Sequence, residues 1–515
     1  MYFSEPFKSS PHSVASPSGE YIATLLPSTG VVVRSTTSLG IIRTIKLPSD
    51  LSGSVTNLLW SPSSTAVLIV GTAHLHIFSI PAGDFHGVVQ VPQPLTAKPA
   101  YVSFGATDNE ACIWSSFGIK LTIVDIKSSK AVEISNPKFY NAASTWRGCS
   151  FRSRTHHLAL LTRVSGKDMI SIHSSQTREI QRSWSPDTID AQGLEWTPDG
   201  RWLAVWESQA HGSRIVFYTP DGHVFHDWRG GHQLPALDDM DQYGSGIKVL
   251  AFSPNGKYTA VANGSDNICV LGDWFVESMR LRHPQTVEPS NTLKIWQEHA
   301  QTRNGQSIGS AFTMAVQAVS PPGLLSNNAS DTRFGCNLVK FDSSSSLLAT
   351  RLDAAPSTIW IWDVSSSELR AVLMYHANVT KVEWHPSQPE LLMMRCEGEG
   401  DGHSGRAFVW DPLSDGPCPI DFSRHLDCPK ITGKTEATWL KVHATESAAI
   451  FFTNHQAGIV VSLTDATKEP WGNPSAAPTN PDHAHDSFDG GFESDMDAAI
   501  SDMDDTFHFK KSPCS

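Results

Sequence analysis

The sequence predicts an all-β protein: a single ring of eight or nine four-stranded blades, a β-propeller, followed by a disordered acidic C-terminal tail. Three observations support this fold class. A short motif recurs at a spacing near 45 residues, and each copy is followed by a segment of alternating apolar residues. The composition combines 16 Trp with 36 Gly and 32 Pro. Such a mixture is typical of many short buried strands joined by tight turns.

The recurring motif consists of an aromatic residue, Ser or Thr, Pro, a polar turn, and then Leu or Ile before Ala. The prolines of its clear copies are Pro17, Pro62, Pro198, Pro254 and Pro386. Pro17 and Pro62 lie 45 residues apart, and Pro62 and Pro198 lie 136 apart, about three times that spacing. Weaker copies occupy the gaps, at Phe104, Phe151, Phe341 and Trp439. Nine units result, which predicts eight or nine blades.

Each unit contains an alternating apolar segment that predicts a β-strand. The nine segments are 31–34, 75–78, 121–125, 170–173, 215–218, 268–271, 359–363, 408–411 and 459–461. Two of them end in Trp-Asp, at Trp362-Asp363 and Trp410-Asp411. A period of about 40 to 45 residues with this dipeptide is the signature of WD40 repeats, in which four antiparallel strands form one blade. We therefore expect most tryptophans to be buried between blades.

The propeller is predicted to span residues 1–464, and the disordered tail residues 465–515. Phe252 and Phe341 lie 89 residues apart, double the period, which predicts a long excursion over residues 283–333 within the propeller. The ninth unit lacks a fourth strand, because the segment after Leu463 is too rich in Pro, Asn and Asp to supply one. We expect the segment from Tyr2 to Lys8 to complete the last blade and close the ring.

Charge and terminal sequence limit the class of protein. The net charge is −13, and residues 465–515 contain 11 Asp and Glu against 3 Lys, which leaves about −5 for the propeller. Neither part has the basic surface that nucleic acids require. The first ten residues lack the apolar core of a signal peptide, and no apolar run approaches the roughly 18 residues that cross a bilayer. The eight cysteines include no C-x-x-C pair, so we expect an intracellular protein with no membrane or nucleic-acid partner.

No arrangement of residues in the sequence predicts catalysis. The G-x-S-x-G, Walker A and H-E-x-x-H motifs are absent. His74 and His76 lie on one face of a predicted strand, but no third ligand is nearby in the sequence, so solvated or core histidines are the better interpretation. The acidic run 397–402 lacks the ligand spacing of a calcium loop. We expect no catalytic residue and no metal, cofactor or small-molecule site.

Two other functions remain as alternatives to a protein-interaction scaffold. A substrate receptor of a cullin-type ubiquitin ligase typically carries Arg two residues after Trp-Asp, whereas Ser365 and Leu413 occupy those positions here. A propeller subunit of the translation machinery would suit a wide ring but not the acidic charge. Neither alternative has a motif of its own in this sequence.

Several segments are more specific than the repeat itself. They are 3–5, 16–23, 193–200, 203–206, 348–351 and 359–363, together with His283-Pro284 at the start of the excursion. In these segments the chain resembles the WD-repeat-containing protein eight family, which is known from centrosomes and yeast spindle poles. The resemblance covers roughly residues 1–464. The unit around Phe104 and the stretch 395–428 depart from it, so partner contacts on those blades cannot be inferred.

The resemblance implies a non-catalytic scaffold in the cytoplasm and cytoskeleton, at the spindle pole body or microtubule-organising centre. The implied partners are a coiled-coil microtubule-anchoring protein and, in yeasts, a minus-end-directed kinesin. Such an assembly helps to tether microtubule minus ends and to organise the mitotic spindle.

The tail contains the one candidate partner-binding motif in the sequence. Ile500, Phe507 and Phe509 stand among acidic residues there. Such acidic and apolar alternation can fold onto a basic, apolar groove of a partner. A solubilising tail without a partner is the alternative.

Overall fold

The computed structural model describes residues 1–51, 55–80, 83, 85–91, 101–115, 118–139, 147–230, 246–303, 306–323, 335–397, 404–426, 434–440 and 447–464. The chain divides into two compact units, Met1–Gly472 and Asn473–Ser515. All described residues belong to the first unit. The predicted tail, with Ile500, Phe507 and Phe509, lies outside the described residues. Its disorder and its docking motif therefore stay predictions.

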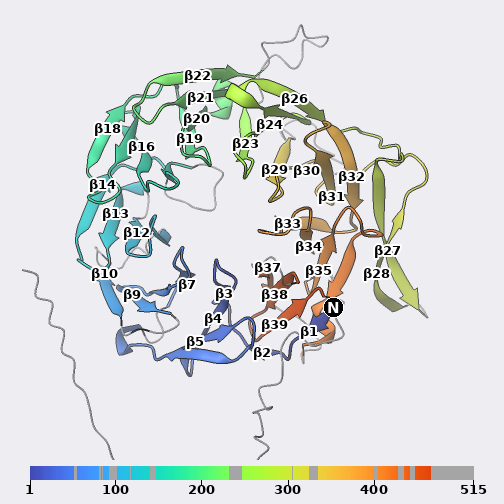
Figure 1. Ribbon diagram of the computed structural model, residues 1–515, viewed down its shortest axis with the longest axis horizontal. Helices are drawn as coiled ribbons and strands as arrows, with labels where there is room; N and C mark the ends of the chain where they lie inside the picture. Colours follow the sequence, from blue (N-terminus) through green and yellow to red (C-terminus); the bar gives the residue numbers. More distant parts are fainter. Residues whose placement is uncertain are drawn as a thin grey trace, which may run out of the picture. The chain divides into compact units, whose positions relative to one another are not determined.

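The described residues form nine β-sheets that follow one another around a ring in the order of the chain (Figure 1). Strands such as β3, β7, β19, β29 and β37 lie nearest the centre of the ring, and the strands that follow them in their sheets lie progressively outward. The predicted β-propeller is thus confirmed, with nine blades.

Blades 1 to 4 each contain four antiparallel strands. Their strands are, for blade 1, β3 (Ser13–Ala15), β4 (Tyr21–Leu26), β5 (Gly30–Ser35) and β6 (Ile41–Ile45); for blade 2, β7 (Asn57–Trp60), β8 (Ala66–Val70), β9 (His74–Ser79) and β10 (His86–Gln90); for blade 3, β11 (Tyr101–Phe104), β12 (Glu110–Trp114), β13 (Lys120–Asp125) and β14 (Ala131–Ser135); and for blade 4, β15 (Cys149–Phe151), β16 (Leu158–Val164), β17 (Lys167–His173) and β18 (Ile180–Trp184).

Blades 5, 6 and 8 have the same four-stranded form. Their strands are, for blade 5, β19 (Ala191–Trp196), β20 (Leu203–Glu207), β21 (Arg214–Tyr218) and β22 (Val224–Arg229); for blade 6, β23 (Ile247–Phe252), β24 (Thr259–Asn263), β25 (Asn267–Leu271) and β26 (Glu277–Arg282); and for blade 8, β33 (Asn378–Trp384), β34 (Leu392–Glu397), β35 (Arg406–Trp410) and β36 (Cys418–Asp421).

Blades 7 and 9 have additional strands. Blade 7 consists of β29 (Cys336–Phe341), β30 (Leu347–Leu352), β31 (Thr358–Asp363) and β32 (Glu368–Met374), with β27 (Lys294–Arg303) and β28 (Gln306–Met314) added; blade 9 consists of β37 (Glu436–Leu440), β38 (Ala449–Thr453) and β39 (Ala457–Ser462), with β1 (Tyr2–Phe3) and β2 (Phe7–Lys8) added. The described 3-10 helices are η1 (Ser49–Leu51), η3 (Gln209–His211), η5 (Asp273–Phe275) and η6 (Phe422–Arg424). None of the helices in the described part of the chain has the length and apolarity needed to cross a bilayer.

The nine predicted apolar segments all fall on the third strand of a blade, which confirms them. These strands are buried along most of their length, as in β5 and β31. A strand is buried on both sides when both faces of its sheet pack against other layers, and it then carries apolar residues in succession. In a propeller the neighbouring blades supply those layers, so a run of apolar residues in the third strand indicates that the blade is packed on both faces.

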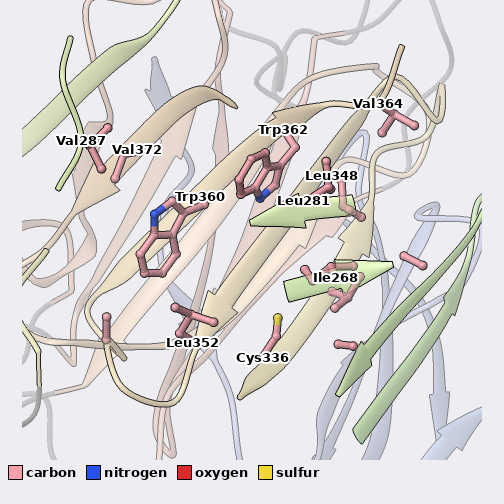
Figure 2. Close-up of a cluster of buried hydrophobic side chains, with 14 of the residues drawn as sticks. Ile268, Leu281, Val287, Cys336, Leu348, Leu352, Trp360, Trp362, Val364 and Val372 are labelled. Carbon is pink, nitrogen blue, oxygen red and sulfur yellow. The ribbon is translucent and has the colours of Figure 1, made fainter. Parts of the chain in front are cut away.

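Most described tryptophans are buried, as predicted. They are Trp60, Trp114, Trp196, Trp206, Trp228, Trp296, Trp360, Trp362, Trp384, Trp410 and Trp439. Figure 2 shows one of the clusters that they form, in which Ile268 and Leu281 of blade 6 lie against Leu348, Trp360 and Trp362 of blade 7. Trp274, at 70% exposed, is an exception in the turn after β25.

A chain of hydrogen bonds links blade 6 to blade 7 beside this cluster. Trp362 donates its Nε1–H to Thr350 Oγ1 at 2.9 Å, and the Thr350 hydroxyl lies 2.9 Å from His283 Nε2. The other ring nitrogen, Nδ1, lies 2.6 Å from the carbonyl oxygen of Asp266. Nδ1 therefore carries the proton and Nε2 accepts from the hydroxyl. Burial lowers the pKa of His283 to about 4, which the Asp266 carbonyl partly offsets, so the ring is neutral at pH 7.

The N-terminus completes blade 9, as predicted. Tyr2 and Phe3 pair with β39 at Ser462 and Val461, and Phe7 pairs with β39 at Gly458. Between the two short strands, Ser4 donates its backbone N–H to the Val460 carbonyl at 2.8 Å. The fourth strand is therefore split into β1 and β2, and residues from both ends of the propeller share one sheet.

Candidate functional site

The predicted excursion over 283–333 contains a β-hairpin. Strands β27 and β28 are antiparallel, and their pairing runs from Trp296 with Met314 to Arg303 with Gln306. At its base, β27 pairs in parallel with β32, from Lys294 with Ala371 onward. Blade 7 is therefore a six-stranded sheet, the widest of the described sheets. The hairpin lies on the outer side of the ring (Figure 1).

The base of the hairpin is fixed by a buried carboxylate. Glu298 in β27 is only 5% exposed. Its Oε2 accepts the backbone N–H of His376 at 2.8 Å, and its carbonyl oxygen accepts from His376 Nε2 at 2.5 Å. His376 follows β32, so these bonds tie the hairpin to the end of blade 7.

Aromatic packing ties the same base to blade 8. The ring of Phe312 in β28 meets Tyr375 edge-to-face at 5.4 Å between centroids and Phe408 at 5.8 Å. Trp296 in β27 lies against Gly416 in the turn after β35, where a Cβ would come within 2.8 Å of the indole ring. Gly416 also has a φ of 104°, a conformation that glycine adopts without strain. The absence of a side chain at Gly416 therefore leaves space for the Trp296 indole on blade 8.

The outer strand of the hairpin offers surface for a partner. In the sheet as described, β28 is the edge strand, and an edge strand presents backbone groups that can pair with another chain. Met314, the last residue of β28, is 52% exposed, and Val316 just beyond it is 85% exposed. The arrangement is a rigid base with an accessible edge and a small apolar surface, which suits binding rather than chemistry.

The two histidines singled out in the sequence lie in β9, and the fold adds a third. His86 in β10 places its Nε2 3.0 Å from His76 Nδ1, although no third ligand was expected near the pair from the sequence. The antiparallel pairing of β9 with β10 brings it there. Within the described residues, no group of three or more His, Cys, Asp or Glu side chains is arranged to hold a metal ion.

The acidic run of 397–402 is described only at Glu397, which ends β34. The remaining residues of the run, and the tail motif of Ile500, Phe507 and Phe509, lie outside the described part of the chain.

No protein-family model matches the chain. It is 24% identical over 394 residues to an uncharacterized WD repeat-containing protein of Schizosaccharomyces pombe, which covers 74% of this chain and 75% of that protein. It is 23% identical over 443 residues to the WD repeat-containing protein WRAP73 of Mus musculus, which covers 80% of this chain and 87% of that protein.

Among solved structures, the crystal structure of the eukaryotic initiation factor superposes with a TM-score of 0.49 at 11% identity, over 82% of this chain and 89% of that one. The β-propeller domain of Myceliophteria thermophila Cps50 (Swd1) gives 0.35 at 13% identity, over 80% of this chain and 99% of that one. The nine-bladed ring and the two sequence similarities make this chain a WD-repeat β-propeller, the architecture of protein-interaction scaffolds.

Proposed function

We propose that this propeller is a non-catalytic scaffold at the spindle pole body or microtubule-organising centre. It docks a coiled-coil microtubule-anchoring protein, and a minus-end-directed kinesin joins the same assembly. Together they tether microtubule minus ends and organise the mitotic spindle.

The proposed location is supported by the resemblance of particular segments to the WD-repeat-containing protein eight family. Segment 348–351 lies in β30 and 359–363 in β31, and 193–200 covers the end of β19 and the turn after it. Segments 348–351 and 359–363 belong to buried strands of blade 7, so the resemblance includes residues that pack inside the ring. The similarity to the mouse WD repeat-containing protein, over 80% of this chain, supports the same proposal.

The proposed mode of action is supported by the β27–β28 hairpin. Its base is anchored through Glu298 and Phe312, so a partner that pairs with β28 would meet a strand whose base is already fixed. Pre-ordered surfaces bind more tightly, because less conformational entropy is lost on association. A rigid ring that holds several partners at once also raises their effective concentration toward one another.

The location is tested with a fluorescent fusion of the full chain in dividing cells. We expect the signal to gather at the spindle poles, and loss of the gene to disturb spindle anchoring or orientation. A diffuse signal through mitosis, with ribosomal proteins or ubiquitin-ligase subunits as the main co-purifying proteins, would contradict the proposal.

The hairpin is tested by shortening it. Replacing residues 301–309 with Asn-Gly joins Ala300 to Ser310, which already pair across the hairpin, through a favoured two-residue turn. We expect an unchanged melting temperature, because the anchors of the base remain, but loss of the coiled-coil protein from the co-purified material. The matched control is Ser165→Asn, in the turn between β16 and β17 where Ser165 has a φ of 51°. It should keep every partner.

A further inference from the structure

A pocket with a volume of about 370 Å³ lies between blades 4 and 5. Blade 4 contributes Arg152 and His157 from the turn between β15 and β16, and Gln181 and Arg182 from β18; blade 5 contributes Trp196 from the end of β19 and Asp221 from the turn between β21 and β22. The volume is within the range of about 300–1,000 Å³ that small-ligand sites occupy. The pocket is far from the β27–β28 hairpin along the ring, since blade 7 carries that hairpin.

Trp196 lacks an indole hydrogen bond that three other repeat tryptophans make. Trp60 and Trp384 end the innermost strands of their blades, and Trp439 is the last residue but one of β37. Each donates its Nε1–H to a carbonyl oxygen of the preceding blade. The acceptors are Val14 at 3.0 Å, Lys340 at 2.8 Å and Glu383 at 2.9 Å. Trp196 is equally buried, at 4% exposed, but its Nε1–H has no hydrogen-bond partner. A buried donor without a partner is costly, and the Trp196 side chain lines the pocket.

The other polar groups of the pocket are mostly donors. Arg152 uses its Nε for the Gly200 carbonyl at 2.6 Å and lies over the Trp196 ring, 5.3 Å from its centroid. Arg182 on β18 is exposed. Among the described residues, the arginines of blade 4 that form ion pairs are Arg147, Arg163 and Arg178, and neither Arg152 nor Arg182 forms one. The pocket lining therefore contains two arginines, Arg152 and Arg182, and one exposed acidic residue, Asp221.

Positive charges near the pocket also affect the pKa of His157. Its Nδ1 is buried without a hydrogen-bond partner. The pKa of His157 is lowered by burial first and then by the charges of Arg152 and Arg178, against smaller opposing effects of hydrogen bonds with Gln181 and the Thr155 backbone. The pocket thus disfavours an added positive charge, and the buried Trp196 Nε1–H has no acceptor. An anion would meet both conditions.

We propose that this pocket binds an anionic side chain of a partner peptide, either a phosphorylated serine or threonine or an aspartate or glutamate. The Trp196 Nε1–H and the guanidinium groups of Arg152 and Arg182 donate to its oxygens. Charge-assisted bonds from arginine to carboxylate or phosphate are among the strongest in proteins, whereas a neutral carbonyl would leave the cations uncompensated. The inference rests on the proposed role as a protein-binding scaffold, and it assigns the chemistry that one site of that scaffold recognises.

The test uses the full chain labelled with 5-fluorotryptophan and three capped peptides, Gly-Gly-X-Gly-Gly, in which X is phosphoserine, glutamate or serine. The fluorine resonance that disappears in Trp196→Phe identifies Trp196. We expect at least one anionic peptide to shift this resonance saturably and the serine peptide to leave it unchanged. A response to phosphoserine alone would identify a phosphorylated partner, and a response to glutamate would identify an acidic one.

Arg182→Gln should weaken the binding about tenfold, the loss expected for one charge-assisted hydrogen bond. Arg182 lies on an exposed outer strand, so this variant should remain folded. The matched control is Arg201→Gln, which removes a neighbouring charge whose side chain is 77% exposed and should leave the affinity unchanged. The inference is overturned if neither anionic peptide shifts the Trp196 resonance, or if both variants weaken binding equally. Pole localisation of the fusion is a separate readout, so a failure of this site is distinguishable from a failure of the proposed function.

Discussion

Phe7 is the residue through which the N-terminus packs into the closing seam of the ring, and shortening it to alanine should weaken the whole propeller. Its ring stacks on Phe451, with 6.1 Å between centroids. It also packs against a cluster that joins Ile22 of blade 1 to Leu440 and Val460 of blade 9. Phe7→Ala therefore removes a contact at the one seam that joins the two ends of the propeller.

The magnitude follows from the burial of the side chain. Truncating a fully buried Phe to Ala costs about 3–5 kcal/mol, and Phe7 is half-buried, so about 2 kcal/mol is expected. Arg34 lies 5.1 Å from the centre of the ring, and losing this cation–π contact adds about 0.5 kcal/mol at an exposed site. Phe7→Leu is the matched control, because it keeps most of the apolar contact and should cost about 1 kcal/mol or less.

The assay is urea unfolding of the full chain, followed by tryptophan fluorescence. Gly458, which pairs with Phe7, gives a sharper test, because a Cβ there would lie 2.8 Å from the Phe7 ring. Gly458→Ala should destabilise the natural chain more than it destabilises Phe7→Ala, where the ring is absent. A double-mutant cycle measures this coupling. An unchanged midpoint for Phe7→Ala, or two effects that simply add, would refute the proposed role of Phe7 in closing the ring.

Three further predictions concern the core, the pH dependence and the tail. Trp362→Ala should cost about 3–5 kcal/mol of unfolding free energy, because Trp362 is 4% exposed; a soluble variant of normal stability by urea titration would make it a surface contact instead. The pKa of His283 is about 4 in the fold against an ordinary value of 6.5, so the unfolded chain binds the proton first as the pH falls. The unfolding free energy should therefore fall by up to about 3 kcal/mol as pH drops from 6.5 to 4. A stability that stays level over this window in urea titrations would contradict that pKa. Deleting residues 465–515 should leave the melting temperature unchanged. If the deletion variant then fails to reach the spindle poles, the motif of Ile500, Phe507 and Phe509 is supported. A clear drop in melting temperature would show that the propeller extends beyond residue 464.

The sequence by itself determined the architecture of the ring. Turn motifs and alternating apolar strands are local signals, and each blade is built from about 45 neighbouring residues, so both the units and the third strand of each could be located without coordinates. The sequence also showed that unit nine lacks a fourth strand, because the composition after Leu463 does not suit a strand. The clasp followed from that deficit, although its division into β1 and β2 did not.

Only the tertiary structure decided the features that depend on contacts between distant residues. The excursion was visible as extra length, but its parallel pairing with β32 joins Lys294 to Ala371, and no local pattern encodes a partner so far along the chain. The choice of nine blades rather than eight depends on the angle between neighbouring blades, which is set by side-chain packing around the whole ring. The pocket at Trp196 also depends on contacts between residues of different blades. Its sequence motif is that of a repeat tryptophan, and only the tertiary structure shows the unpartnered Nε1–H and the positions of Arg152 and Arg182 on the neighbouring blade.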